Sequence, residues 1–189
     1  GGGTVVEIGS VRGRSMVVLA STAAPGVELV AIDPDAGNDR GPQEISGFEA
    51  EAADDHEVFK ANLEHAGVAE RVRHVRKFSD EAHADVVSTV DVLYIDGAHR
   101  YKPARKDVHD WGARVRTGGT MLIHDSFSSV GVSLAIMREL LTSRRFRYVG
   151  RSRSLTEFRA DLDPSARARL VNALRLLAQL PWFVKNLLV

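Results

Sequence analysis

The sequence lacks cysteine, apolar runs of membrane-spanning length and internal repeats. None of its 189 residues is Cys, which excludes disulfides, catalytic thiols and thiolate metal sites. No run reaches the roughly 18 apolar residues that a transmembrane helix needs, and no signal peptide is evident, so we expect a cytoplasmic protein. The apolar fraction of 44% and the charged fraction of 26% are typical of a folded domain and exclude a disordered or collagen-like chain.

Charged residues are divided unequally along a chain whose formal net charge is zero. Residues 144–189 hold ten Lys or Arg and three Asp or Glu, whereas the rest of the chain has an excess of acidic groups. A basic segment can attract an anionic partner, although an ordinary solvated surface has the same composition. We adopt the solvated surface as the main interpretation. Nucleic acid is not an expected partner, because the N/D-P-P-Y/F-type signature of nucleic-acid methylation is absent.

Short apolar runs alternate with amphipathic segments along most of the chain. The expected strands are Thr4–Ile8, Val27–Asp33, Arg71–Arg76, Asp91–Asp96 and Thr120–His124. The expected helices are Arg14–Ala23, Asp54–His65, Ser79–Ser88, Pro103–Val115 and Ser128–Ser143. This alternation predicts a parallel α/β sheet with right-handed crossovers. Phe146–Arg151 and Leu155–Arg159 predict an antiparallel pair at one sheet edge.

Residues 161–189 differ from the domain expected over residues 1–160. Asp163-Pro164 predicts a helix start, with Asp as the N-cap and Pro in the first turn. Three leucines recur on one face of that helix: Leu170, Leu174 and Leu177. Pro181 stops or bends the helix. We expect this amphipathic extension to pack on the domain or on a second copy of the chain, with peripheral membrane contact as the remaining alternative.

The first expected strand enters a glycine-containing loop. Glu7-Ile8-Gly9-Ser10-Val11-Arg12-Gly13 contains a glycine, Gly9, that permits a sharp turn and close approach of a ligand to the backbone. Its GxxxG spacing is not the GxGxxG of dinucleotide folds, and no Lys-Ser/Thr pair follows as in a nucleotide P-loop. The second strand ends at Asp33, where an acidic residue of a doubly wound fold can bond both ribose hydroxyls. The alternative for Asp33 is a cap before a proline turn.

These segments and three later ones resemble the class I S-adenosylmethionine-dependent methyltransferases. The later segments are Tyr94–Tyr101 (YIDGAHRY), Gly118-Gly119 and His124-Asp125. The patterns IDGxHxY and HD are similar to a subgroup of O-methyltransferases that modify natural products and sugars. The resemblance implies a Rossmann-like, doubly wound α/β sheet, mostly parallel with an antiparallel C-terminal hairpin strand, plus a C-terminal helix. Residues 1–160 would then be the S-adenosylmethionine-binding methyltransferase domain.

The same resemblance implies positions for S-adenosylmethionine. The glycine loop, supported by Glu7, would hold the methionine part, Asp33 the ribose, and Asp96 the ammonium group, while Phe78-Ser79 would lie beside the adenine. The expected cofactor-binding residues are Glu7, Gly9, Ser10, Gly13, Asp33, Phe78, Ser79 and Asp96. Because the sulfonium carries an already activated methyl group, the protein needs only to position the acceptor and remove its proton.

Acidic and imidazole side chains follow two expected strands. Asp96 and His99 follow the fourth strand, and His124 and Asp125 follow the fifth, at the carboxyl ends where open α/β sheets place ligands. Similarity to catechol-type relatives implies that Asp96 and Asp125 bind Mg²⁺ or another divalent cation and that His99 is the base. Ser126 stands where those relatives carry a carboxamide, so metal dependence stays open. The expected catalytic residues are His99 and Asp96, with a carboxylate-bonded structural histidine as the alternative for His99 and a structural role for His124.

The expected function is therefore methylation of a hydroxyl group on a small molecule, such as a natural product, a sugar or a phenol. Assistance by a divalent metal and formation of a homo-oligomer are open alternatives. A second class of function is a noncatalytic module that binds the cofactor and acts through partners. The basic segment and the apolar C-terminus favour that alternative.

Further expectations concern residues outside these motifs. Pro34–Gly47 is polar and glycine-containing, which fits either a lid over the site or a plain surface loop. The chain begins at Gly1 rather than Met, and we expect that a preceding segment is missing. Five other histidines are expected on the surface: His56, His65, His74, His83 and His109.

Overall fold

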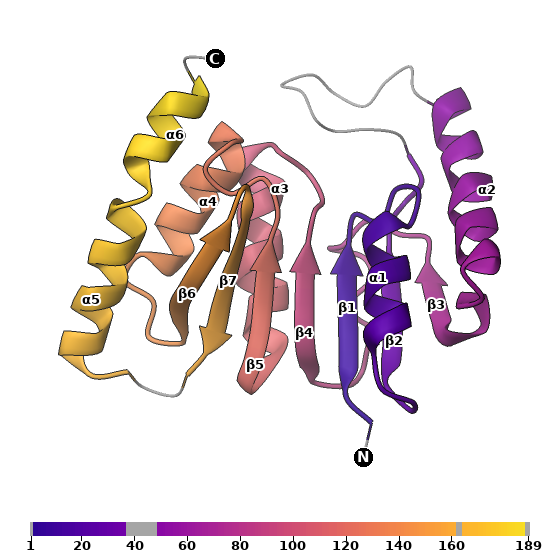
Figure 1. Ribbon diagram of the computed structural model, residues 1–189, viewed down its shortest axis with the longest axis horizontal. Coiled ribbons are helices and arrows are strands. Elements are labelled where there is room, and N and C mark those ends of the chain that lie inside the picture. The colour runs from indigo at the N-terminus through magenta and orange to yellow at the C-terminus, as the bar shows by residue number, and fades with distance from the viewer. Residues whose placement is uncertain (1, 37–48, 162–163, 188–189) are drawn as a thin grey trace.

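The computed structural model of the protein describes residues 2–36, 49–161 and 164–187. In this part of the chain, seven strands form a sheet in the order β3-β2-β1-β4-β5-β7-β6 (Figure 1). The strands are β1 Thr4–Ile8, β2 Glu28–Ile32, β3 Val72–Val75, β4 Val90–Ile95, β5 Val115–Ile123, β6 Phe146–Ser152 and β7 Leu155–Ala160. Strands β1 to β5 are parallel, whereas β7 lies antiparallel between β5 and β6. The predicted mostly parallel sheet with an antiparallel C-terminal hairpin is confirmed.

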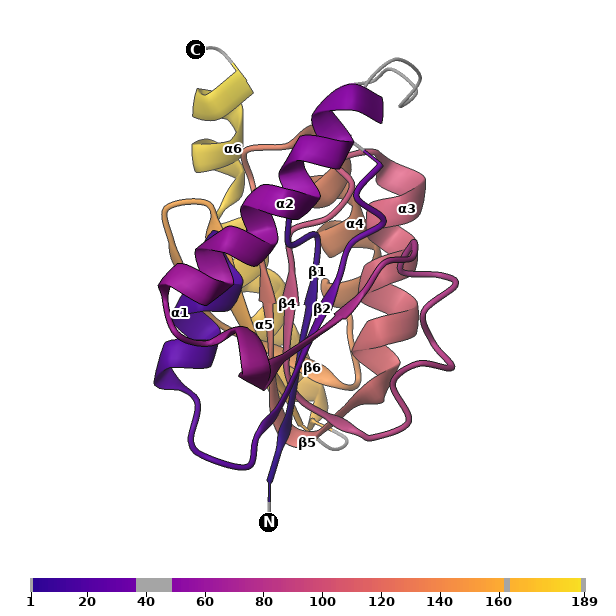
Figure 2. The ribbon, with the colours of Figure 1, turned by 90° about the vertical axis from the view of Figure 1, so that its right-hand side faces the viewer.

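Helices cover both faces of the sheet. They are α1 Arg14–Thr22, α2 Glu49–His65, α3 Tyr101–Lys106, α4 Val130–Leu140, α5 Ala166–Leu177 and α6 Leu180–Leu187. A π turn, Asp107–Trp111, and a 3-10 turn, Gly112–Arg114, continue α3. Figure 2 shows α1 and α2 on one face and α3 and α4 on the opposite face, as a doubly wound fold requires.

The central strands are buried on both faces because helices lie over each. In β1, where every residue is buried, Val5 packs with Met16 and Phe59 of α1 and α2. Its neighbour Val6 belongs to the cluster on the opposite face, which contains Trp111. The direction of strand addition reverses at β1, which lies between β2 and β4, and open α/β sheets bind ligands beyond the carboxyl ends of strands at such a point. The loops after β1 and β4 therefore meet where a site is expected.

Residues 79–88, predicted as a helix with Ser79 as its N-cap, form a series of turns instead. Side chains from the segment after α3 hold these turns. Trp111 Nε1 donates a hydrogen bond to Ser79 O at 3.0 Å, and the Arg114 guanidinium donates to two other carbonyl groups of the segment. These carbonyl groups are thus satisfied by distant side chains rather than by helical N–H groups, and the helix prediction is wrong.

Three element boundaries also differ from prediction. Helix α2 begins at Glu49 rather than Asp54, because the Glu- and Ala-rich residues before Asp54 are strong helix formers. Strand β5 begins at Val115 rather than Thr120, and its register with β4 shifts near the start of the pairing. Helix α3 begins at Tyr101, ahead of the predicted start.

The C-terminal residues form two helices rather than one bent helix. The N-cap of α5 is Ser165, whose Oγ accepts a hydrogen bond from the Ala168 N–H at 3.2 Å. Asp163, the predicted cap, lies outside the described residues, as does most of the predicted lid segment Pro34–Gly47. Pro181 lies in the first turn of α6, where its missing N–H costs the helix nothing.

Helix α5 packs beside the edge strand β6 through a polar contact. Asn172 Oδ1 accepts the Tyr148 backbone N–H at 2.6 Å, and Asn172 Nδ2 donates to Leu140 O at 3.1 Å. Leu176 is fully buried beside this contact. The three leucines of the predicted face do not pack on the domain and are exposed in the single chain: Leu170, Leu174 and Leu177. Among the described residues, no helix combines the length and apolarity needed to cross a membrane.

Candidate active site

A cavity of about 380 Å³ lies at the carboxyl ends of β1, β2 and β4. Its volume is in the range of small-ligand sites. Five of the predicted cofactor-binding residues line it: Gly9, Asp33, Phe78, Ser79 and Asp96. The other three, Glu7, Ser10 and Gly13, are not among its lining residues.

The glycine loop needs glycine at two positions for steric reasons. Gly9 has φ +83°, and a Cβ there would overlap the Asp96 carbonyl group, so the ends of β1 and β4 could not approach each other as they do. Gly13 has φ +77° at the start of α1, and a Cβ there would lie 2.9 Å from the Phe59 ring. The Gly13 N–H donates to Ser10 O at 2.7 Å and closes the turn.

Glu7 is a fully buried carboxyl group next to this loop. Burial raises the pKa of Glu7 to about 7, and the nearby hydroxyls of Ser15 and Ser10 act in the opposite direction. Glu7 therefore changes charge close to neutral pH. A charge beneath the loop would favour a cationic group bound above it.

Asp33 both stabilises its own turn and faces the cavity. Its Oδ2 accepts the Val11 N–H at 2.8 Å, and its Oδ1 accepts the Asp35 N–H at 2.8 Å. Burial raises the pKa of Asp33, whereas these two backbone hydrogen bonds lower it. Each carboxylate oxygen keeps a further lone pair for a ligand hydroxyl. The turn and ribose interpretations of Asp33 are thus compatible.

The far end of the cavity holds a buried carboxyl group that the sequence analysis did not assign to the site. Asp107 is 4% exposed, lines the cavity and accepts a hydrogen bond from the Ser79 hydroxyl. Burial raises the pKa of Asp107 to about 7. Pro103, four residues earlier on the same side of this helical segment, also lines the cavity. Phe78, 45% exposed, provides an apolar wall at this end.

Four side chains from the ends of β4 and β5 form a continuous series of contacts, which we call the strand-end cluster: Asp96, His99, His124 and Asp125. His99 Nε2 lies 2.9 Å from Asp125 Oδ2, and His124 Nδ1 lies 3.2 Å from both Asp125 Oδ2 and Asp96 Oδ1. The prediction that these residues meet at the sheet edge is confirmed. Asp96 lines the main cavity, and Asp96, His99 and His124 also line a small adjoining pocket.

Contacts between carboxylates and imidazoles determine the charges in the strand-end cluster. The carboxylates of Asp125 and Asp96, each 3.2 Å from His124 Nδ1, raise the pKa of His124 to about 10, so its imidazole is protonated at neutral pH. The same contact with His124, followed by that with His99, holds the pKa of Asp125 well below its usual range. His124 is therefore a cation between two carboxylates at neutral pH.

The strand-end cluster has two carboxylates, Asp96 and Asp125, that could bind Mg²⁺ together with water, but the His124 imidazole lies between them. Ligand atoms of Asp96, His124 and Asp125 lie within 4.8 Å of one another. Ser126 is buried and hydrogen-bonded to Thr156 Oγ1 at 2.7 Å, so its hydroxyl is not turned toward the cluster. The protonated His124 already supplies a positive charge between the carboxylates. No step is therefore assigned to Mg²⁺ here.

Two of the five histidines predicted on the surface are exposed as expected, namely His65 and His109. His83 stacks on the buried Trp111 ring, with ring centroids 4.7 Å apart. His56 and His74 are largely buried, and for them the prediction is wrong. Helix α2 lies against the end of β3, which brings two rings together that are distant in sequence.

Residues 6–126 match the family model described as "Methyltransferase domain". The chain belongs to this methyltransferase family. The match includes the glycine loop, Asp33 and the strand-end cluster, and it confirms the predicted class of S-adenosylmethionine-dependent methyltransferases. S-adenosylmethionine is the cofactor of this class. A comparison with curated proteins finds no match.

The solved structures that match this fold include both O-methyltransferases and an rRNA methylase. The O-methyltransferase NovP matches with a TM-score of 0.66 at 16% identity, over 84% of this chain and 72% of that chain. The O-methyltransferase TomG from Streptomyces achromogenes, involved in tomaymycin synthesis, matches with a TM-score of 0.56 at 18% identity, over 84% and 73%. An rRNA methylase from Streptococcus thermophilus matches with a TM-score of 0.58 at 13% identity, over 85% and 87%. At these identities the likeness shows the shared fold alone.

Proposed function

We propose that this methyltransferase transfers the methyl group of S-adenosylmethionine to a hydroxyl oxygen of a small molecule. The observation that carries the proposal is the pairing of His99 with Asp125 at 2.9 Å, beside a cavity that Asp96 and Asp33 line. A histidine oriented by a carboxylate is suited to removing a hydroxyl proton. The likeness in fold to NovP and TomG, both O-methyltransferases, supports this choice of acceptor atom.

The cavity offers complementary groups for each part of the cofactor. Asp33 accepts the ribose hydroxyls, and Phe78 packs against the adenine. The carboxylate of Asp96 and the nearby Glu7 favour the ammonium and sulfonium charges. The glycine loop leaves room for close approach to the backbone because it has no Cβ at Gly9. When bound, S-adenosylmethionine supplies a methyl group that is already activated for transfer.

His99 acts as the general base in this proposal. Its Nε2 faces Asp125, so Nε2 carries the hydrogen and Nδ1 accepts the proton of the acceptor hydroxyl. Asp125 stabilises the imidazolium that forms, and the bridging His124 holds Asp125 in place. Asp96 connects this proton-accepting pair to the cofactor cavity, because it contacts His124 and lines the cavity.

The test combines cofactor binding with a panel of hydroxylated acceptors. Calorimetry should show that S-adenosylhomocysteine, the demethylated cofactor, binds the chain, and mass spectrometry should show an added methyl group on oxygen. Absence of binding at about 1 mM cofactor would contradict the proposal, since that corresponds to only about 4 kcal/mol of binding free energy. Binding without transfer to any acceptor would favour the noncatalytic module. Transfer to nitrogen or to RNA only would overturn the choice of acceptor.

A further inference from the structure

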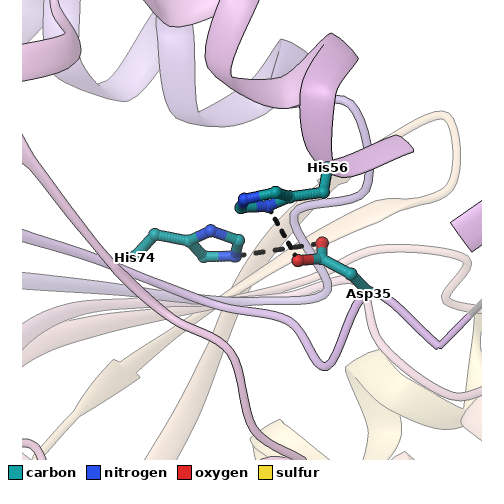
Figure 3. A group of neighbouring side chains, drawn as sticks. All are labelled: Asp35, His56 and His74. Atoms are coloured by element: carbon teal, nitrogen blue, oxygen red, sulfur yellow. Dashed lines mark ion pairs between the residues drawn. The ribbon is translucent and has the colours of Figure 1, made fainter. Parts of the chain in front are cut away.

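A second group of carboxylate and imidazole side chains lies away from the strand-end cluster. Asp35 from the loop after β2, His56 from α2 and His74 from β3 face one another (Figure 3). We call them the helix-side cluster. His56 Nδ1 lies 2.9 Å from Asp35 Oδ2, and His74 Nε2 lies 4.0 Å from Asp35 Oδ1. The Asp35 side chain is 1% exposed, that of His56 18% and that of His74 13%.

Several buried polar atoms of the helix-side cluster lack a hydrogen bond. Among the described residues, none is a hydrogen-bond partner of Asp35 Oδ1, His56 Nδ1, His74 Nδ1 or His74 Nε2. His56 Nδ1 is close to the carboxylate but outside hydrogen-bond geometry. Buried polar groups of folded proteins are nearly always hydrogen-bonded, and an ion is one of the explanations for a group that is not. Here the atoms without partners are all potential metal ligands.

The ligand atoms have the spacing and the chemistry of a metal site. One atom each from Asp35, His56 and His74 lies within 4.8 Å of the others, so a single ion could contact all three. Two imidazole nitrogens and one carboxylate oxygen favour zinc and similar transition metals over Mg²⁺ or Ca²⁺. Metal-binding histidines must be neutral.

Neighbouring side chains hold these ligands in position. Arg76 Nε donates to Asp35 Oδ2 at 2.7 Å, which leaves Oδ1 without a partner and directed to the cluster. The His74 ring packs on Phe59 with centroids 4.4 Å apart and stacks on His56 with centroids 5.3 Å apart. Outer hydrogen bonds and packing of this kind orient metal-binding side chains.

We propose that Asp35, His56 and His74 bind one transition-metal ion of the zinc class, which ties the loop after β2 to α2 and β3. Asp35 lies two residues after Asp33, whose carboxylate accepts the Asp35 N–H. The ion would therefore brace the wall of the cavity at Asp33 without entering the cavity itself, since none of the three ligands lines it.

The experiment titrates zinc chloride into chain that carries no polyhistidine tag and has been stripped with a chelator. Calorimetry should detect zinc binding tighter than about 10 μM, about 7 kcal/mol of binding free energy. Zinc at a hundredfold excess over its Kd should raise the unfolding temperature by about 5–10 °C. The visible spectrum of bound Co²⁺ should show tetrahedral nitrogen and oxygen ligands. Wild-type chain without such binding would overturn the proposal directly.

Matched variants assign the site. His56→Gln and His74→Gln should each lose the zinc-dependent rise in unfolding temperature, whereas His65→Gln, an exposed histidine on the same helix as His56, should keep it. Asp125→Asn, in the strand-end cluster, should also keep it. Arg76→Gln should bind zinc as tightly as the wild type or more tightly, because it frees the second Asp35 oxygen. Zinc binding that survives both His56→Gln and His74→Gln, or that only Asp125→Asn abolishes, would place the ion elsewhere and refute the proposal.

Discussion

The strand-end and helix-side clusters contain the same two residue types but differ in charge. In the strand-end cluster, two carboxylates share His124, and the pKa of that imidazole rises to about 10. In the helix-side cluster, two imidazoles share one carboxylate, Asp35, which Arg76 already neutralises. Burial then dominates, and the pKa of His74 falls. The number of carboxylates that contact one imidazole and the depth of its burial thus decide whether that imidazole gains or loses affinity for a proton.

This difference separates the two clusters by function. A cationic His124 cannot accept a proton or bind a metal, but it can hold Asp125 ready to orient His99. The helix-side cluster has imidazole nitrogens without hydrogen-bond partners among the described residues, which suits a metal, but its side chains do not line the cavity where an acceptor would be deprotonated. A substitution in one cluster should therefore leave the properties that depend on the other unchanged.

The largest effect is expected for His99→Gln. Loss of the general base should lower kcat by about 10²–10⁴-fold, while the Kd for S-adenosylhomocysteine changes little. Steady-state kinetics and calorimetry on the same preparation measure the two quantities. His65→Gln should change neither. Equal losses in kcat and in cofactor affinity would mean that His99 has a structural role.

Asp33→Ala should have the next largest effect, and on cofactor binding. Removal of hydrogen bonds to a charged group typically costs 1.5–3 kcal/mol, so the Kd for S-adenosylhomocysteine should rise about 10–100-fold. In the metal-free chain, Asp35→Asn, only two residues away, keeps the backbone N–H that Asp33 accepts and should leave this Kd within about threefold. If Asp33→Ala and Asp35→Asn weaken the binding of S-adenosylhomocysteine equally, the helix-side cluster is part of the cofactor site.

These clusters also show which parts of the site the sequence could predict. The strand-end cluster was predictable because parallel strands in a sheet end at the same edge, so residues that follow two neighbouring strands must meet. Gly9 and Asp33 were predictable for the same reason. The helix-side cluster was not predictable, since it depends on how α2 packs against β3. The number of residues between His56 and His74 does not determine how that helix and that strand are oriented.

The strands were predicted correctly where local sequence determines the structure, and the helix over residues 79–88 was predicted wrongly where distant residues determine it. The buried parallel strands have continuous apolar runs, and those runs alone locate β1, β2 and β4. The segment 79–88 has a plausible helix pattern, but its carbonyl groups bond to Trp111 and Arg114, which the local sequence does not contain. Tertiary hydrogen bonds there outweigh the local preference.

Stability should depend on pH in opposite directions in the two clusters. His124 has a folded pKa of about 10, above the unfolded value of 6.5, so its contribution is complete below pH 6.5 and is lost as the pH rises toward 10. The loss should be about 1–2 kcal/mol after screening by solvent. Urea unfolding from pH 6.5 to 10 measures it. In the Asp96→Asn variant, His124 has one carboxylate contact fewer, so its pKa should be lower. The loss of unfolding free energy should then be smaller and should end at a lower pH than in the wild type.

For His74 the sign is reversed. Its folded pKa lies below 6.5, so the metal-free chain should keep the contribution above pH 6.5 and lose it as the pH falls below that value. His74→Gln should remove this acid-side loss and leave the alkaline-side loss due to His124 intact. NMR titration of the imidazole protons tests both assignments. Titration of His124 near pH 6.5 would contradict its role as a cation at neutral pH.

The smallest effect is expected for a chelator on methyl transfer. Because the His124 imidazolium already neutralises the strand-end carboxylates, EDTA should leave kcat within about twofold, and added Mg²⁺ should not restore or increase it. The same treatment should lower the unfolding temperature of zinc-loaded chain, since the helix-side ligands would lose their ion. A chelator that abolishes turnover in the His56→Gln variant would show that a metal serves the strand-end cluster. If the chelator changes neither turnover nor the unfolding temperature of zinc-loaded chain, neither cluster binds a metal ion.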